Sequence, residues 1–134
     1  MRWVLDTSAF SAVMKHDGGM MSLLEKHRPR DIVTVPPAVA EIQYGLHRIR
    51  NATKKFLLLN AEKDRLLSII AVLPWIPESS VLFGKIKADL EQRGEIIDDF
   101  DIAIAAIALS HHRGVITANM KHFQRIKGLD CGDW

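Results

Sequence analysis

Cysteine is nearly absent from this sequence. Cys131 is the only one in 134 residues, so no disulfide can form within the chain. A chain of this length is the size of one domain, and it can bury about two-thirds of the surface that its unfolded form exposes. We therefore expect a single domain over residues 1–134 that folds without cross-links. The cysteine usage also favours a reducing, cytoplasmic compartment.

Long apolar runs are missing as well. The longest, residues 66–77, is interrupted by Pro74, and the carboxylate of Asp6 stands where a signal peptide would continue its apolar segment. Both features argue against secretion and against membrane insertion. We expect no contact with a membrane.

Excess charge of one sign is also lacking. The net charge is only +2 at pH 7, which does not by itself indicate a nucleic-acid partner. Basic residues nevertheless gather within residues 27–30, 47–55 and 121–127. Each of these clusters is either an ordinary solvated helix face or a contact for nucleic-acid phosphates, and composition leaves both interpretations open.

Short apolar strands alternate with helical patterns along the chain. Strands are expected at residues 3–5, 31–35 and 115–117. Helices are expected directly after Asp6, at 20–27, at 37–49, at 52–72, from a cap at Ser79 or Ser80 to Gly94, at 100–111 and around Phe123. Residues 73–77 suit only an edge strand or a connector, and the tail to Trp134 has no expected element. The alternation predicts an α/β fold of three layers (α/β/α), with helices on both faces of a central parallel sheet.

In a parallel sheet of this kind, functional sites lie beyond the carboxyl ends of the strands. The residues that follow Leu5, Val35 and Ile116 are therefore the first to consider. Asp6 comes directly after the first strand, where it either caps the next helix or serves a site.

Glu41 lies in the middle of the helix expected at residues 37–49, off its apolar stripe. It shares a helix row with Ala38 and Gly45, and two small residues would let another element approach closely. A glycine inside a helix costs about 1 kcal/mol relative to alanine, so we expect a structural reason for it. The alternative is a solvent-facing glutamate with an incidental glycine.

Three more carboxylates precede the apolar helix at residues 100–111. Asp98 is the expected helix cap and Asp99 a secondary candidate, because helix N-termini favour anions. Asp101 opens a helix that is otherwise almost wholly apolar, so it should point into a pocket at the rim of the sheet. Thr117 and Asn119 follow the late strand, where they either serve a metal-bound water or make a turn.

If Asp6, Glu41 and Asp101 gather at one rim, their charges repel unless a cation lies between them. Ligands that offer only oxygen select hard ions such as Mg²⁺ or Mn²⁺, and no Cys/His spacing suggests zinc. Such an ion can activate a water and neutralise charge on a phosphate. The pattern therefore favours phosphoryl chemistry, with basic residues at the rim to hold a nucleic-acid backbone.

These motifs resemble a known family, the PIN-domain ribonuclease toxins of the VapC type. The resemblance spans the whole chain. It rests on Leu5-Asp6-Thr7-Ser8, on Glu41 within residues 40–45, on Asp98-Asp99-Phe100-Asp101 followed by Ile104-Ala105-Ala106, on residues 117–123, on residues 125–129 and on Trp134.

The resemblance implies a PIN-like fold and a Mg²⁺- or Mn²⁺-dependent endoribonuclease, with Asp6, Glu41 and Asp101 as catalytic and metal-binding residues. It also implies cleavage of structured RNA such as tRNA or rRNA, arrest of translation, silencing by a cognate antitoxin that covers the active-site groove, and a homodimer. Thr7 joins Asp98, Asp99, Thr117 and Asn119 as a secondary site candidate, while Lys121, His122 and Arg125 are candidates for RNA contacts. Many relatives carry an acidic residue after the last catalytic strand, where this chain has Asn119 and His122.

Two other functions compete with cleavage. A PIN-like module could bind RNA or a partner without cutting it, if its acidic pocket is too depleted for catalysis. A phosphatase with Asp6 as covalent nucleophile is a weaker alternative, because the second aspartate expected at position 8 is Ser8.

Overall fold

The computed structural model describes residues 2–50 and 53–134. Its strands are β1 (Trp3–Leu5), β2 (Ile32–Thr34), β3 (Ala71–Val72), β4 (Gly114–Ile116) and β5 (Cys131–Gly132). They form one sheet in the order β3-β2-β1-β4-β5, and every neighbouring pair is parallel. The predicted central parallel sheet is confirmed.

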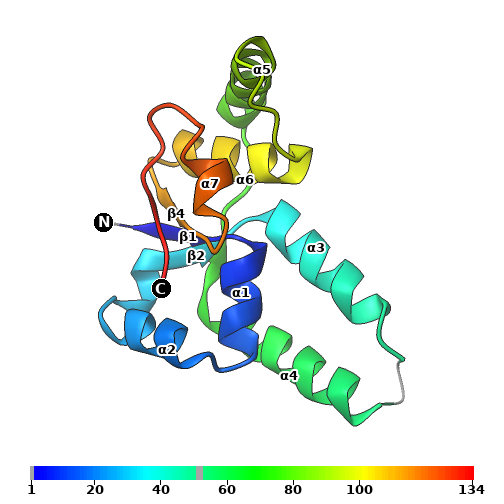
Figure 1. Ribbon diagram of the computed structural model, residues 1–134. Helices are drawn as coiled ribbons and strands as arrows, with labels where there is room; N and C mark the ends of the chain where they lie inside the picture. The colour runs from blue at the N-terminus through cyan, green and yellow to red at the C-terminus, as the bar shows by residue number, and fades with distance from the viewer. Residues whose placement is uncertain (1, 51–52) are drawn as a thin grey trace.

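Helices connect these strands and cover both faces of the sheet (Figure 1). Their bounds are α1 (Thr7–Met14), α2 (Gly18–Glu25), α3 (Pro36–His47), α4 (Lys54–Ile69), α5 (Pro77–Gln92), α6 (Asp99–Ser110) and α7 (Met120–Phe123), with a 3₁₀ turn at Pro29–Asp31. Figure 1 shows α3 and α4 as the two arms of a hairpin that extends away from the sheet. Among the residues described, no helix is long and apolar enough to cross a membrane.

Side chains of the central strands alternate between two apolar cores, as the pleat of a strand requires. Val4, Val33 and Val115 pack with α5, α6 and α7 in one core. Leu5, Ile32 and Ile116 pack with α1, α2, α3 and α4 in the other. A buried sheet with a helical layer on each face is the α/β/α arrangement that the sequence predicts.

Several predicted boundaries are wrong. The helix expected at 52–72 ends at Ile69, and Ala71–Val72 pairs with β2, so the edge strand begins two residues before the segment 73–77 in which it was predicted. The predicted start at Ala52 lies outside the described residues. The N-cap residue of α5 is Ile76 and not either predicted serine, although Ser79 takes part in capping three residues later, where its hydroxyl accepts from the backbone N–H of Ile76 at 3.1 Å. The tail, for which no element was expected, supplies β5, because pairing with β4 orders two residues that carry no periodic signal.

Candidate active site

The carboxylate of Asp6 is fixed by three hydrogen bonds at the carboxyl end of β1. Its Oδ1 accepts from the Ser8 hydroxyl at 2.6 Å and from the backbone N–H of Ala9 at 2.9 Å. Its Oδ2 accepts from the Thr117 hydroxyl, which follows β4, at 2.5 Å. Asp6 is therefore the predicted cap of α1 and also the link between the ends of two neighbouring strands.

Burial sets the electrostatics of this carboxylate. Asp6 is 1% exposed, and burial raises its pKa, while the donors from Ser8, Thr117 and Ala9 oppose that rise.

Glu41 reaches the same rim from α3. Its Oε1 accepts a hydrogen bond of 2.5 Å from the hydroxyl of Thr7, the residue that follows Asp6. Thr7 thus couples the first turn of α1 to the middle of α3. The predicted reason for Gly45 is wrong, since nothing lies within 4 Å of a Cβ added at that exposed position. Ala38, on the same row, is fully buried.

Asp101 stands in the first turn of α6, with its side chain 16% exposed. Its Oδ2 lies 3.3 Å from Nδ1 of His122, which comes from α7. Burial is the main cause that raises the pKa of Asp101, and the negative charges of Asp6 and Asp98 raise it further, while His122 lowers it. Asp101 and Asp6 therefore lie within each other's electrostatic field.

The secondary acidic candidates have separate local roles. Asp98 is the predicted cap of α6, and its Oδ1 accepts from the backbone N–H of Phe100 at 2.7 Å. Asp99 is exposed and forms an ion pair with Lys87 of α5 at 3.1 Å. Asp98 adds charge to the rim, whereas Asp99 is turned toward α5.

The basic candidates lie on and beside α7. Lys121 is exposed, and His122 contacts Asp101 as described. Arg125 donates from Nη1 to the carbonyl of Ile96 at 3.1 Å, which ties α7 to the loop before α6. The side chain of Asn119 makes no capping hydrogen bond at the start of α7, and its backbone N–H donates to Thr117. Exposed Asn119 and Lys121 thus border the acidic rim.

The donor set suits a hard divalent cation, because Asp6, Glu41 and Asp101 offer only oxygen and two of them have raised pKa values. Even so, within residues 2–50 and 53–134 no three His, Cys, Asp or Glu side chains are grouped so that they could hold a metal ion as they stand. In the structure, the charge of Asp6 acts on Asp101, and Glu41 is connected to this pair by its hydrogen bond with Thr7. A metal site shared by all three carboxylates stays a prediction.

Ser8 shapes the site, a role that the sequence did not suggest. Its hydroxyl donates to Asp6 and accepts from the backbone N–H of Ala118 at 2.9 Å, so it joins α1 to the loop after β4. The available signal was its position two residues after an aspartate that caps a helix, where a short hydroxyl can fold back onto the cap.

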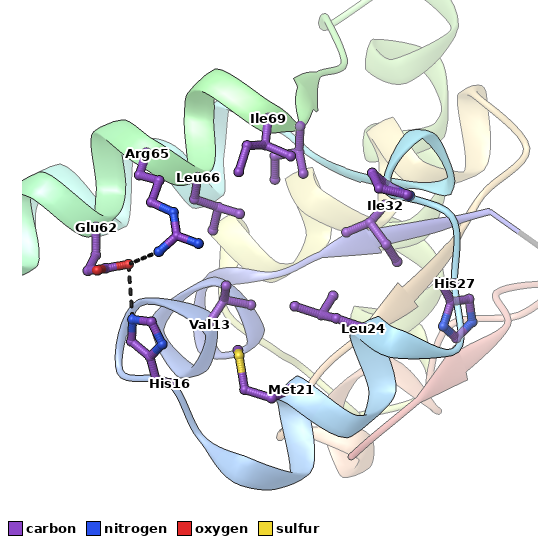
Figure 2. Close-up of a pocket in the computed structure, with 12 residues that line it drawn as sticks. Val13, His16, Met21, Leu24, His27, Ile32, Glu62, Arg65, Leu66 and Ile69 are labelled. Atoms are coloured by element: carbon purple, nitrogen blue, oxygen red, sulfur yellow. Dashed lines mark ion pairs between the residues drawn. The ribbon is translucent and has the colours of Figure 1, made fainter.

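An apolar pocket of about 230 Å³ lies away from these residues, between α1, α2 and α4 (Figure 2). Val13, Met21, Leu24 and Leu66 line it, and His16, Glu62 and Arg65 form ion pairs across its mouth. None of the acidic site residues lines this pocket, so it takes no part in their chemistry.

Comparison with known proteins identifies the type of domain. The family model described as "PIN domain" matches residues 3–129. Ribonuclease VapC2 of Rickettsia felis is 29% identical over 136 residues, which cover 100% of this chain and 98% of that protein. Ribonuclease VapC2 of Haemophilus influenzae is 30% identical over 96 residues, which cover 72% of this chain and 70% of that protein.

A solved structure shares the complete fold. The crystal structure of VapBC2 from Rickettsia felis, bound to a DNA fragment from its promoter, contains a chain that matches this one with a TM-score of 0.86 and 28% identity. The match covers 100% of this chain and 99% of that chain.

Proposed function

Because the chain belongs to the PIN-domain family, and within it to the VapC ribonucleases, we propose that it is the toxin of a toxin–antitoxin pair and a metal-dependent endoribonuclease. Residues 1–134 would form a single nuclease domain that hydrolyses phosphodiester bonds of structured RNA, tRNA or rRNA, and so arrests translation in the cytoplasm. One observation carries the proposal. Asp6 accepts three hydrogen bonds at the end of a central strand, and its negative charge raises the pKa of Asp101. Glu41 accepts a hydrogen bond from Thr7, the residue next to Asp6.

Asp6, Glu41 and Asp101 are the residues that would hold Mg²⁺ or Mn²⁺, with Asn119 as a further oxygen donor. When bound, the ion supplies a water of lowered pKa and neutralises charge that develops on the phosphate. The hydrogen bonds from Ser8 and Thr117 keep the Asp6 carboxylate in a single orientation, as a preorganised ligand requires. The ring of His122 contacts the carboxylate of Asp101, with 3.3 Å between Nδ1 and Oδ2.

RNA would enter along the rim formed by the starts of α1, α6 and α7. Lys121 and Arg125 would contact phosphates and position the backbone without reading its sequence. Exposed Phe100, beside Asp101 in the first turn of α6, offers an aromatic face to an unpaired base.

The protein partners in this proposal are a cognate antitoxin and a second copy of the chain. The antitoxin is supported by the likeness to a chain of the Rickettsia felis VapBC2 structure. The homodimer is supported by large apolar side chains that are exposed on the α3–α4 hairpin, namely Tyr44, Leu57, Leu58 and Ile69. Light scattering on the purified chain tests the dimer, and co-expression with the neighbouring reading frame tests the antitoxin.

Cleavage is tested by incubating the purified protein with total RNA and mapping the new ends. We expect products with Mg²⁺ or Mn²⁺, none with chelator, and none from Asp6→Asn or Asp101→Asn. Asp64→Asn is the matched control, because Asp64 is an exposed carboxylate on α4 that pairs with Lys63 outside the site. An Asp101→Asn protein that cuts RNA in the presence of chelator would refute the proposal.

A second candidate function is RNA binding without cleavage. It is favoured by one finding, namely that the described residues form no ready three-member metal group. RNA binding that persists in chelator, with no product under any metal tried, would support this candidate over the nuclease.

A further inference from the structure

A cavity of about 390 Å³ lies at the end of the sheet opposite Asp6. Arg2 and Arg113 line it, together with His112, Gly128 and Asp130. Arg2 directly precedes β1 and Arg113 directly precedes β4. Because Trp3 is paired with Gly114 in the parallel ladder, the two arginines occupy matching positions on neighbouring strands. The register therefore places two arginines next to each other at the amino ends of β1 and β4.

One of these guanidinium groups has an unsatisfied donor. The Nη1 atom of Arg113 is buried and has no hydrogen-bond partner among the described residues. Burial lowers the pKa of Arg113, and the positive charge of Arg2 lowers it further. Proteins pair nearly all buried polar groups, so an orphaned guanidinium nitrogen needs an explanation.

The acidic neighbours do not supply that explanation. Asp31 lies 3.6 Å from Nε of Arg2 and opposes the shift at Arg113, yet it makes no hydrogen bond to either arginine among the described contacts. The side chain of Arg2 is 65% exposed, so this loose ion pair is screened by water. Asp130 lines the cavity but is itself an exposed residue.

Capping of α6 does not explain Arg113 either. The carbonyl of Ala108 accepts from the backbone N–H of Arg113 at 2.8 Å, and that of Leu109 accepts from the N–H of His112 at 3.0 Å. His112 has a φ of 56°, the left-handed conformation that typically ends a helix in this way. Backbone N–H groups thus satisfy the carbonyls at the end of α6, so the Arg113 side chain is not needed as a cap.

We propose that Arg2, Arg113 and His112 form a binding site for a phosphate group in this cavity. A guanidinium fork matches phosphate oxygens with paired N–H donors, and two forks beside a histidine suit a tetrahedral dianion better than a planar carboxylate. The phosphate comes either from a nucleic-acid backbone or from a free phosphate or nucleotide. Binding of free phosphate does not depend on the proposed nuclease function, whereas the backbone source rests on it.

The site is tested by titrating the ¹⁵N-labelled chain with inorganic phosphate at constant ionic strength, with chloride as the balancing anion. We expect saturable shifts of the Gly114 and Gly128 amides and of the Arg113 Nε–H signal. Arg113→Gln and Arg2→Gln should each weaken binding about tenfold or more, because each removes one guanidinium fork. Arg65→Gln on α4 is the matched control and should bind phosphate like the parent.

Two results of the phosphate titration would overturn the proposal. One is the absence of saturable shifts, and the other is equal phosphate affinity in the parent, Arg113→Gln and Arg2→Gln proteins. Arg2→Gln keeps the test decisive if Arg113→Gln fails to fold, since Arg2 is mostly exposed. A parallel titration with acetate and succinate checks the ligand class, and tighter binding of a carboxylate than of phosphate would also refute it.

A second arm separates the two phosphate sources. Binding of RNA to the Asp101→Asn protein, with and without Arg113→Gln, is measured across a salt series. If the site holds a backbone phosphate, Arg113→Gln reduces the slope of log K against log salt concentration by about 1. An unchanged slope, with phosphate binding still lost, assigns the site to free phosphate or a nucleotide. If the protein binds phosphate but no RNA, the result counts against the proposed function, and the phosphate site is still supported.

Discussion

Replacement of Thr117 by valine isolates the hydrogen bond that crosses from β4 to β1. Thr117 is fully buried, and its hydroxyl is the donor to Oδ2 of Asp6. Valine keeps the branched shape but removes this donor. A hydrogen bond to a charged group contributes about 1.5–3 kcal/mol, so the free energy of unfolding should fall by that amount at pH 7. The melting temperature should fall by about 4 °C for each kcal/mol.

The pH dependence of this loss identifies its cause. Burial already raises the pKa of Asp6 above 3.8, and removal of the donor raises it further. The folded state therefore binds the proton more tightly than the unfolded state. The cost of the substitution is present in full above the folded-state pKa of Asp6 and shrinks as the pH falls through it.

Urea unfolding at pH 7 and at pH 4 measures both quantities. With an m-value of about 1–3 kcal/mol/M, a loss of 2 kcal/mol moves the midpoint by about 1 M. Thr117→Ser keeps the hydroxyl and should retain most of the stability at pH 7. Thr117 also accepts from the backbone N–H of Asn119, and loss of that bond alone would cost the same at both pH values. An equal loss at both pH values, or none at pH 7, would refute the assignment to Asp6.

Four further predictions concern the site, the sheet and helix α3. Mg²⁺ at 100 times its dissociation constant should raise the unfolding free energy by about 2.7 kcal/mol in the parent and by much less in Asp101→Asn, as measured by thermal shift. Without metal, Asp101→Asn should be more stable than the parent at pH 7, because the fold disfavours the ionised carboxylate of Asp101. This advantage should shrink as the pH falls toward 3.8. An advantage that grows in acid would contradict the raised pKa of Asp101. Gly114→Ala should destabilise the protein by about 1–3 kcal/mol, since its Cβ would lie 2.5 Å from the Trp3 ring and 3.0 Å from a backbone carbonyl. Gly45→Ala, in open space on α3, should instead stabilise it by about 0.5–1 kcal/mol, and equal denaturation midpoints for the two alanine variants would show that the contacts at Gly114 do not matter.

The central strands and the positions of Asp6 and Thr117 at strand ends could be predicted from the sequence because both follow local rules. Short β-branched runs predict strands, and the rule that sites follow strand ends selects Asp6 and Thr117. The edge strands β3 and β5 have two residues each, too few for any period, and they exist only because β2 and β4 offer them a partner.

Contacts between distant side chains are the part that pattern alone does not predict. The helical pattern predicts the place of Glu41 on a helix, yet its hydrogen bond to Thr7 depends on how α1 packs against α3. The pairing of Arg2 with Arg113 depends on the register between β1 and β4, which no local feature of either segment encodes. In both cases the sequence supplies the residue type, and the tertiary packing of helices or strands determines its neighbour.

The parallel sheet gathers like charges at both of its ends, and for the same reason. Neighbouring parallel strands start and finish at the same edges, so residues before β1 and β4 meet at one edge and residues after them meet at the other. Arg2 and Asp6 are separated by the three residues of β1, which corresponds to about 13 Å along an extended chain. At that separation the two clusters should contribute independently, because sites more than about 7–10 Å apart that share no partners are usually additive. The phosphate binding proposed at the arginine end and the metal binding proposed at the carboxylate end should therefore be separable, and loss of either should leave the other measurable.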